Sequence, residues 1–203
     1  MPRLFSIKPG LTLKGRKFKG LRGWAGKPFH PPLTDIPIAA YILAAVFDVM
    51  SWLKQPADQM AVVNGDHLSF LSYDLWRAAT FVLIAGLIVS IPTALTGFWD
   101  WLKSTPKRTQ ARRTANWHMT LMIATTVLVV INVISRLVAD PQLSTPPVLM
   151  VLSLVIAGVV SLGATYGGSL VYDYGFNVET AGDHPVWHES EKDVFPGEDR
   201  SID

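Results

Sequence analysis

The stretch "PPVLMVLSLVIAGVVSLGATYGGSLVY", residues 146–172, decides the fold. It is continuously apolar, carries no charged side chain and is rich in glycine toward its end. A helix of about 20 apolar residues crosses the hydrocarbon core of a bilayer, and transmembrane helices contain glycine more often than soluble ones. The stretch therefore predicts a membrane-spanning helix at about residues 147–171.

Three further apolar runs precede this one, at about residues 33–53, 78–99 and 117–135. The 203 residues are 49% hydrophobic and only 17% charged, which is too apolar for an ordinary soluble domain. The runs are continuous and show no alternation of apolar and polar residues, which excludes a transmembrane β-barrel. We expect an all-α polytopic membrane protein, folded as a four-transmembrane-helix bundle.

Lysine and arginine are distributed unevenly along the chain. Eight precede the first span and five lie between the second and third, whereas two lie between the first and second, one between the third and fourth, and two after the last. Thirteen of the 18 therefore lie on one side, in the N-terminal arm and the second loop. Cytoplasmic segments carry the excess of these residues, so we expect both termini to be cytoplasmic.

The chain divides into three parts. A basic cytoplasmic arm at 1–30 has eight Lys or Arg and no acid, the transmembrane domain covers 31–172, and an acidic cytoplasmic tail at 173–203 has nine Asp or Glu against two basic residues. Basic segments beside a membrane bind anionic lipid with about 1 kcal/mol per residue, which makes anionic lipid a candidate partner of the arm. We expect no nucleic-acid partner.

Asp48 lies inside the first predicted span, about 7.5 Å from its outer end. An ionisable residue at the centre of a membrane helix costs about 2.5 to 3.5 kcal/mol on insertion scales and usually faces protein or water. Asn132 in the third span lies at a similar depth, so we expect a hydrogen bond between these two side chains. A proton pathway needs further ionisable groups deeper in the bundle, and the sequence offers none.

A second polar cluster is predicted at the inner boundary, because successive helices alternate in direction. It comprises His30 and Asp35 around the start of the first span, Asp100 at the end of the second and His118 at the start of the third. In one interpretation the histidines are structural and hydrogen-bonded to Asp35 and Asp100. In the other, His30 and His118 are axial ligands of a b-type haem, because imidazole is the usual ligand where cysteine is absent. Their position at the edge of the spans counts against haem.

Cysteine is absent, which removes disulfides, thiolate-ligated haem and cysteine-held iron–sulfur clusters. The sequence contains no nucleophile elbow, phosphate-binding loop or dinucleotide fingerprint. We therefore predict no catalytic residues and no metal site made of protein ligands alone. The sequence favours a protein that is not an enzyme.

Four segments resemble a known family: "FHPPLTDIPIAAYILAAVFD", "ALTGFWDWL", "RTANWHMTLM" and "GGSLVYDYGFNVE". Over residues 26–180 the chain is similar to the DUF2231 family of bacterial integral membrane proteins. The resemblance implies four spans and a multi-pass location in the bacterial inner (plasma) membrane. The family motifs fall here at His30 and Pro31, at Gly97 with Asp100 and Trp101, at His118, and at residues 167–172.

The chain departs from the family pattern at one place. Many members have a second histidine in a His-x-Pro element, whereas here Asp35 precedes Ile36 and Pro37. Some relatives join this unit to a Rieske-type iron–sulfur domain, which implies a place near electron transfer. This chain has no cysteine and cannot hold that cluster.

Three functions remain open from the sequence. The leading hypothesis is a non-catalytic accessory or anchoring subunit of an inner-membrane assembly, respiratory or redox in character, with other membrane subunits as partners. The alternative is a b-type haem electron-transfer protein that uses His30 and His118. The second alternative is a small-solute or proton transporter.

Overall fold

The structure is a computed structural model that describes residues 29–54, 62–64, 67–139, 142–174 and 176. The predicted basic arm at 1–30 and acidic tail at 173–203 lie almost wholly outside the described residues. Their roles, and the cytoplasmic placement of the termini, stay predictions.

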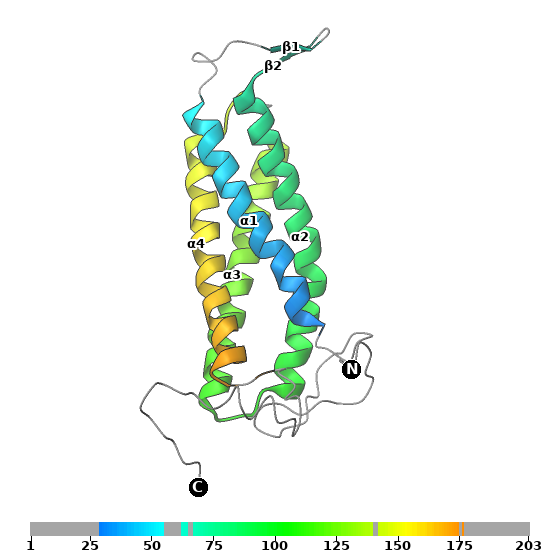
Figure 1. The fold of residues 1–203 in the computed structure, drawn as a ribbon, viewed down its shortest axis with the longest axis vertical. Helices are drawn as coiled ribbons and strands as arrows, with labels where there is room; N and C mark the ends of the chain where they lie inside the picture. The colour runs from blue at the N-terminus through cyan, green and yellow to red at the C-terminus, as the bar shows by residue number, and fades with distance from the viewer. Residues whose placement is uncertain (1–28, 55–61, 65–66, 140–141, 175, 177–203) are drawn as a thin grey trace, which may run out of the picture.

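The described residues form four long helices and one small hairpin (Figure 1). The helices are α1 (His30–Leu53), α2 (Leu71–Ser104), α3 (Gln110–Val138) and α4 (Pro147–Tyr172). Each predicted span lies within one of them, so the predicted all-α bundle of four membrane-spanning helices is confirmed. The strands β1 (Val62–Asn64) and β2 (His67–Ser69) pair antiparallel between α1 and α2, an element that the sequence analysis did not predict.

The first helix begins earlier than its apolar run. Pro31 and Pro32 occupy its first turn, where proline is tolerated because the missing N–H has no helical partner there. His30 is consequently the first residue of α1 rather than part of a preceding loop. At the start of α3, the Thr109 side chain accepts a hydrogen bond from the backbone N–H of Arg112 and caps the helix.

The helices are arranged in a ring in which α1 packs against α2 and α4, while α3 packs against α4 and, less extensively, α2. Helices α1 and α3 therefore face each other across the diagonal of the bundle. Every helix contributes to the central core; the largest fully buried apolar side chains are Tyr41, Leu83, Val129 and Ile156. In Figure 1 the α1–α2 pair diverges from the α3–α4 pair toward the lower end of the bundle.

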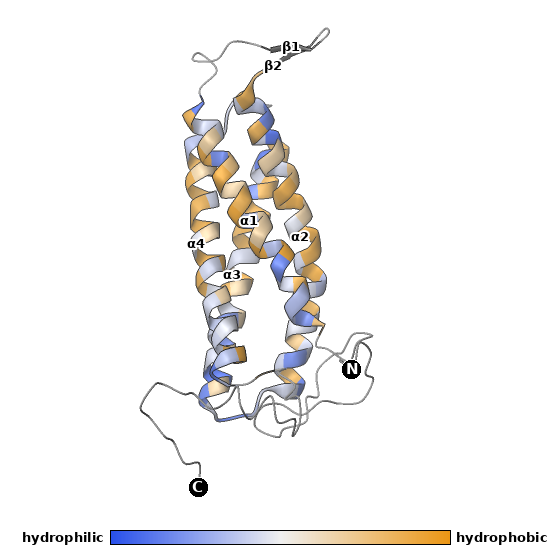
Figure 2. Cartoon of the chain, viewed as in Figure 1, coloured by the Kyte–Doolittle hydropathy of each residue, from blue (hydrophilic) through white to orange (hydrophobic). Residues whose placement is uncertain are grey.

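The outer surface of the bundle is apolar. Phe81, Leu95 and Val148 are each more than half exposed, with 61%, 67% and 77% of their surface accessible. Figure 2 shows hydrophobic residues over the middle of the bundle and more hydrophilic residues at its ends. All four helices, with 24 to 34 residues, are long and apolar enough to cross a membrane. This distribution is what a lipid environment requires.

Helices α1 and α2 approach each other closely at Gly86. A Cβ atom at this position would lie 2.7 Å from Cε1 of Tyr41 and 2.9 Å from Cβ of Ala40. One turn further along α2, the Tyr41 hydroxyl shares a hydrogen bond of 2.6 Å with Ser90. Small residues allow this close approach. The van der Waals contacts that result hold the helices together in lipid, where the hydrophobic driving force between helices is missing.

We expect Gly86→Ala to lower the free energy of unfolding by about 1 to 3 kcal/mol, because the added methyl group overlaps atoms of two buried side chains, which have to shift. Gly158→Ala is the matched control, since a Cβ there meets no atom within 4 Å and alanine favours helix. Thermal unfolding in a mild detergent, followed by circular dichroism, measures both. Equal stability of the two variants would contradict the close approach at Gly86.

Candidate functional site

A pair of histidines meets at the lower end of the bundle in Figure 1. His30 begins α1 and His118 is the ninth residue of α3, so the two side chains come from diagonally opposed helices. Their ring centres are 6.3 Å apart and the ring planes are inclined at 79°. Sequence reasoning placed both residues at one end of the bundle, and the structure brings their rings into direct proximity.

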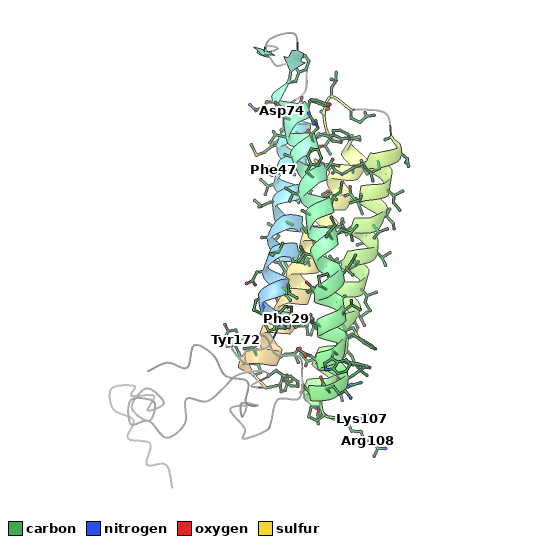
Figure 3. All side chains as sticks on the ribbon, turned by 90° about the vertical axis from the view of Figure 1, so that its right-hand side faces the viewer. Phe29, Phe47, Asp74, Lys107, Arg108 and Tyr172 are labelled. Carbon is green, nitrogen blue, oxygen red and sulfur yellow. The ribbon has the colours of Figure 1, made fainter. Side chains whose placement is uncertain are left out.

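The histidine pair lies deeper in the bundle than the sequence suggested. His118 is about 12 Å along the axis from the start of α3, and Gly97 on α2 is about 10 Å from the end of its helix. Figure 3 shows Lys107 and Arg108, in the loop between α2 and α3, well beyond Phe29, the residue before His30. Three of the four helices thus continue past the pair, so the two rings lie within the bundle and not at its very end.

Each imidazole is fixed by a backbone carbonyl of the helix beside it. Nδ1 of His30 lies 3.0 Å from the carbonyl oxygen of Thr93 on α2, and Nδ1 of His118 lies 2.8 Å from that of Gly163 on α4. A carbonyl oxygen can only accept, so each Nδ1 carries the proton and donates it. In the neutral ring this leaves Nε2 with a free lone pair, the arrangement in which histidine binds metals.

Glycines make room for both rings. A Cβ at Gly97 would lie 2.6 Å from Cε1 of His30, and a Cβ at Gly167 would lie 3.1 Å from Cε1 of His118. Each imidazole therefore lies close against a neighbouring helix backbone. The two glycines belong to the motifs on which the family resemblance rested, and their close contact with the histidines supplies a physical reason for their presence.

The two aspartates of the predicted inner cluster have different surroundings. Asp35 is exposed on α1, whereas Asp100 is buried near the end of α2. One interpretation of the sequence had the histidines hydrogen-bonded to these two aspartates. In the structure, Nδ1 of each histidine bonds a backbone carbonyl instead.

The donor set limits the metals that this site can hold. No group of three or more His, Cys, Asp or Glu within the described residues could bind a metal ion, and a protein-bound zinc needs at least three such ligands. An imidazole nitrogen lies about 1.2 Å from its ring centre and about 2 Å from a first-row metal, so rings on opposite sides of one metal have centres about 6 Å apart. The observed 6.3 Å between the centres of the two rings, which meet edge to face, is close to this value. A porphyrin supplies the four remaining ligands of its own iron.

A buried ion pair occupies the opposite end of the bundle. Asp48 on α1 and Arg136 on α3 are both fully buried at their side chains, and Nη2 of Arg136 donates to Oδ2 of Asp48 at 2.5 Å. Ser153 on α4 donates to the same oxygen at 2.5 Å, and Thr145 donates to Oδ1 at 2.9 Å. The carboxylate is thereby satisfied on both oxygens.

The sequence analysis expected a direct hydrogen bond between Asn132 and Asp48. In the structure Asn132 bonds two other residues instead. Its side-chain oxygen accepts from Nε of Arg136 at 2.7 Å, and its amide nitrogen donates to Ser153 at 2.9 Å. Both of these partners bond Asp48 in turn. Arg136 was missed because the predicted third span ended one residue before it, so it was counted as a loop charge. Its spacing of four residues from Asn132, which places both on one helix face, was the available signal.

The same network fixes the loop before α4. The backbone N–H of Thr145 donates to Ser51 at 2.9 Å, and Ser51 donates to the carbonyl oxygen of Ser72 at 2.6 Å. On the other side, Arg136 reaches the Thr80 hydroxyl on α2 at 3.1 Å. The ion pair and its neighbours therefore connect all four helices.

We expect Asp48→Ala to lower the free energy of unfolding by about 3 to 5 kcal/mol, because it leaves the Arg136 charge buried and unpaired. The double variant Asp48→Leu with Arg136→Met removes both charges and should regain much of this loss. Thermal unfolding in detergent compares the three proteins. A double variant no more stable than the single one would show that the wider hydrogen-bond network, and not the unpaired charge, sets the cost.

Comparison with known proteins matches the transmembrane region. The family model described as "Predicted membrane protein (DUF2231)" matches residues 26–180, which contain all four helices and both histidines of the pair. No curated protein and no solved structure matches the chain. The match covers well over half of the chain, and the protein therefore belongs to the DUF2231 family of predicted membrane proteins.

Proposed function

We propose that this membrane protein is a b-type cytochrome that transfers single electrons, with His30 and His118 as the two axial ligands of one haem. The observation that carries the proposal is the 6.3 Å separation of two imidazoles that approach each other from diagonally opposed helices. Two histidines suffice for a haem, whereas a protein-bound zinc needs at least three protein ligands.

The protein's own contribution is to hold two imidazoles in fixed positions. The carbonyl groups of Thr93 and Gly163 set the tautomer of each ring and prevent its rotation. His30 is further restrained by the Thr96 hydroxyl, 3.4 Å from Nδ1. A carbonyl acceptor on Nδ1–H also makes Nε2 a better donor to iron than an unsupported imidazole would be.

Coordination by both histidines would determine the class of chemistry. Bound there, a haem iron would exchange one electron between its ferrous and ferric states and leave no open position for oxygen or substrate. The two histidines lie between the α1–α2 and α3–α4 helix pairs, which diverge toward this end in Figure 1. Electron transfer is therefore the activity that the site supports.

The accessory role in a larger membrane assembly is compatible with this proposal, because an electron-transfer protein needs a donor and an acceptor. The transport hypothesis has less support. Asp48 is fully paired by Arg136, Thr145 and Ser153, so it offers no free carboxylate to carry a proton or cation.

The absorption spectrum of the purified protein tests the proposal. We expect a Soret band that shifts on reduction with dithionite, with sharp α and β bands, from protein produced with ample haem. His118→Ala should lose most of the bound haem, while His67→Ala, a histidine substitution in β2 at the other end, should retain it. Folded wild-type protein without a Soret band would overturn the proposal and leave an accessory role without a haem.

The angle between the two rings gives an independent readout. If both histidines held a haem with their planes inclined at 79°, the ferric protein would give a highly anisotropic low-spin electron paramagnetic resonance signal. A rhombic signal typical of parallel planes would show that the rings rotate on binding. A high-spin signal would exclude coordination by both histidines.

Gly97→Ala tests the tight packing of His30. The added Cβ would lie 2.6 Å from Cε1 of the imidazole, so the ring has to shift away from α2. We expect lower haem content or a changed reduction potential, measured by redox titration, with Gly158→Ala as the matched control. A potential and haem content identical to those of the wild type would contradict the role given to Gly97.

A further inference from the structure

A pocket of about 280 Å³ opens between α2 and α3 at the end of the bundle away from the histidines. Its walls are formed by the first turns of α2 and the last turn of α3. Figure 3 marks this end by Asp74, in the first turn of α2. The lining residues on which the argument rests are Tyr73, Trp76, Arg77, Phe81, Arg136 and Leu137.

The inner wall of the pocket carries hydrogen-bond donors. Arg136 is 2% exposed, and its guanidinium group directs Nη2 at Asp48 and Nη1 at Thr80. Trp76 is 8% exposed, and its indole Nε1–H has no hydrogen-bond partner among the described residues. The Nε1 atom itself has no accessible surface, so an acceptor in the pocket reaches it only when the indole shifts, and that contact then offsets the cost of about 1 to 3 kcal/mol of a buried donor without a partner.

The outer rim of the pocket carries an exposed cation. The guanidinium of Arg77 lies 5.5 Å from the ring centre of Tyr73 and 5.8 Å from that of Phe81. These two rings hold the charge over the entrance. The pocket thus combines an exposed positive charge with an indole N–H, a pairing suited to an anionic oxygen acceptor such as a phosphate.

The remaining walls are apolar and continue onto the lipid-facing surface. Phe81 and Leu137 are 61% and 65% exposed, and they flank the pocket on α2 and α3. Tryptophan, tyrosine and arginine together are typical of the level of the lipid head groups. A ligand that places a phosphate beside Arg77 therefore has an apolar surface available for its acyl chains.

We propose that this pocket binds one phospholipid of the adjacent leaflet, with its phosphate at Arg77 and Trp76 and an acyl chain along Phe81 and Leu137. A redox-active quinone fits less well, because Trp76 and Gly97 on α2 are about 30 Å apart along the helix axis. That separation is too long for direct electron exchange between the pocket and the histidine pair. The proposal is independent of whether a haem is bound.

Native mass spectrometry of the full-length protein in mild detergent tests the proposal, with phosphatidylglycerol as the probe. Dioleoylglycerol, which has the same apolar chains without the phosphate, is the comparison lipid. We expect one phosphatidylglycerol to stay bound and dioleoylglycerol to bind at least tenfold more weakly, as the loss of a charged hydrogen bond implies. Equal binding of the two lipids would overturn recognition of the phosphate.

Two variants separate the named contacts from general lipid adhesion. Arg77→Gln should weaken phosphatidylglycerol binding about tenfold, whereas Arg113→Gln, the same change at an exposed position of α3 near the histidine end, should leave it unchanged. Trp76→Phe removes the indole N–H but keeps an aromatic ring, and should weaken binding without lowering the stability of the lipid-free protein. Wild-type affinity in Arg77→Gln, or equal losses in Arg77→Gln and Arg113→Gln, would overturn the assignment.

Discussion

The buried ion pair between Asp48 and Arg136 is the constraint on which the arrangement of the four helices depends. In a membrane, apolar side chains gain little by leaving lipid for the bundle interior, so helices need specific contacts to choose their neighbours. A carboxylate and a guanidinium placed away from water are tolerated only when both are satisfied. Here that requirement brings together groups from every helix and from the loop before α4. The pair determines register as well as contact, because a shift of one residue in α1 or α3 would separate the two charges and a shift in α2 or α4 would remove a hydrogen bond to one of them.

The histidine end of the bundle is organised by a different rule. There the imidazoles donate to backbone carbonyls, and glycines replace side chains where the rings meet the neighbouring helices. Such contacts orient side chains but provide little cohesion, and α2 and α3 pack less extensively than the other neighbouring pairs. A bundle held firmly at one end can remain more open at the other. This division places the buried ion pair at one end of the bundle and the histidine pair at the other.

Much of the architecture could be predicted from the sequence, because continuous apolar runs such as residues 146–172 have few alternatives to a membrane helix. The alternation of helix direction was enough to place His30 and His118 at one end. This alternation could not show that the two histidines lie on diagonally opposed helices with their rings in edge-to-face contact, since that depends on which helices are neighbours. Arg136 was missed for a related reason: hydropathy ended the third span before it, although a paired charge can lie within a helix that the bundle buries.

Two glycines of α4 show that one sequence pattern can serve two structural purposes. Gly163 and Gly167 are spaced four apart on α4, a pattern common where helices pack closely. In the structure, a Cβ at Gly163 would meet Met122 and one at Gly167 would meet His118, so one glycine serves packing and the other the site. The carbonyl of Gly163 adds a third role, because it accepts the Nδ1 proton of His118. A short glycine motif therefore couples helix packing to imidazole orientation, and a change that tightens or loosens α3 against α4 must also move a ring of the histidine pair.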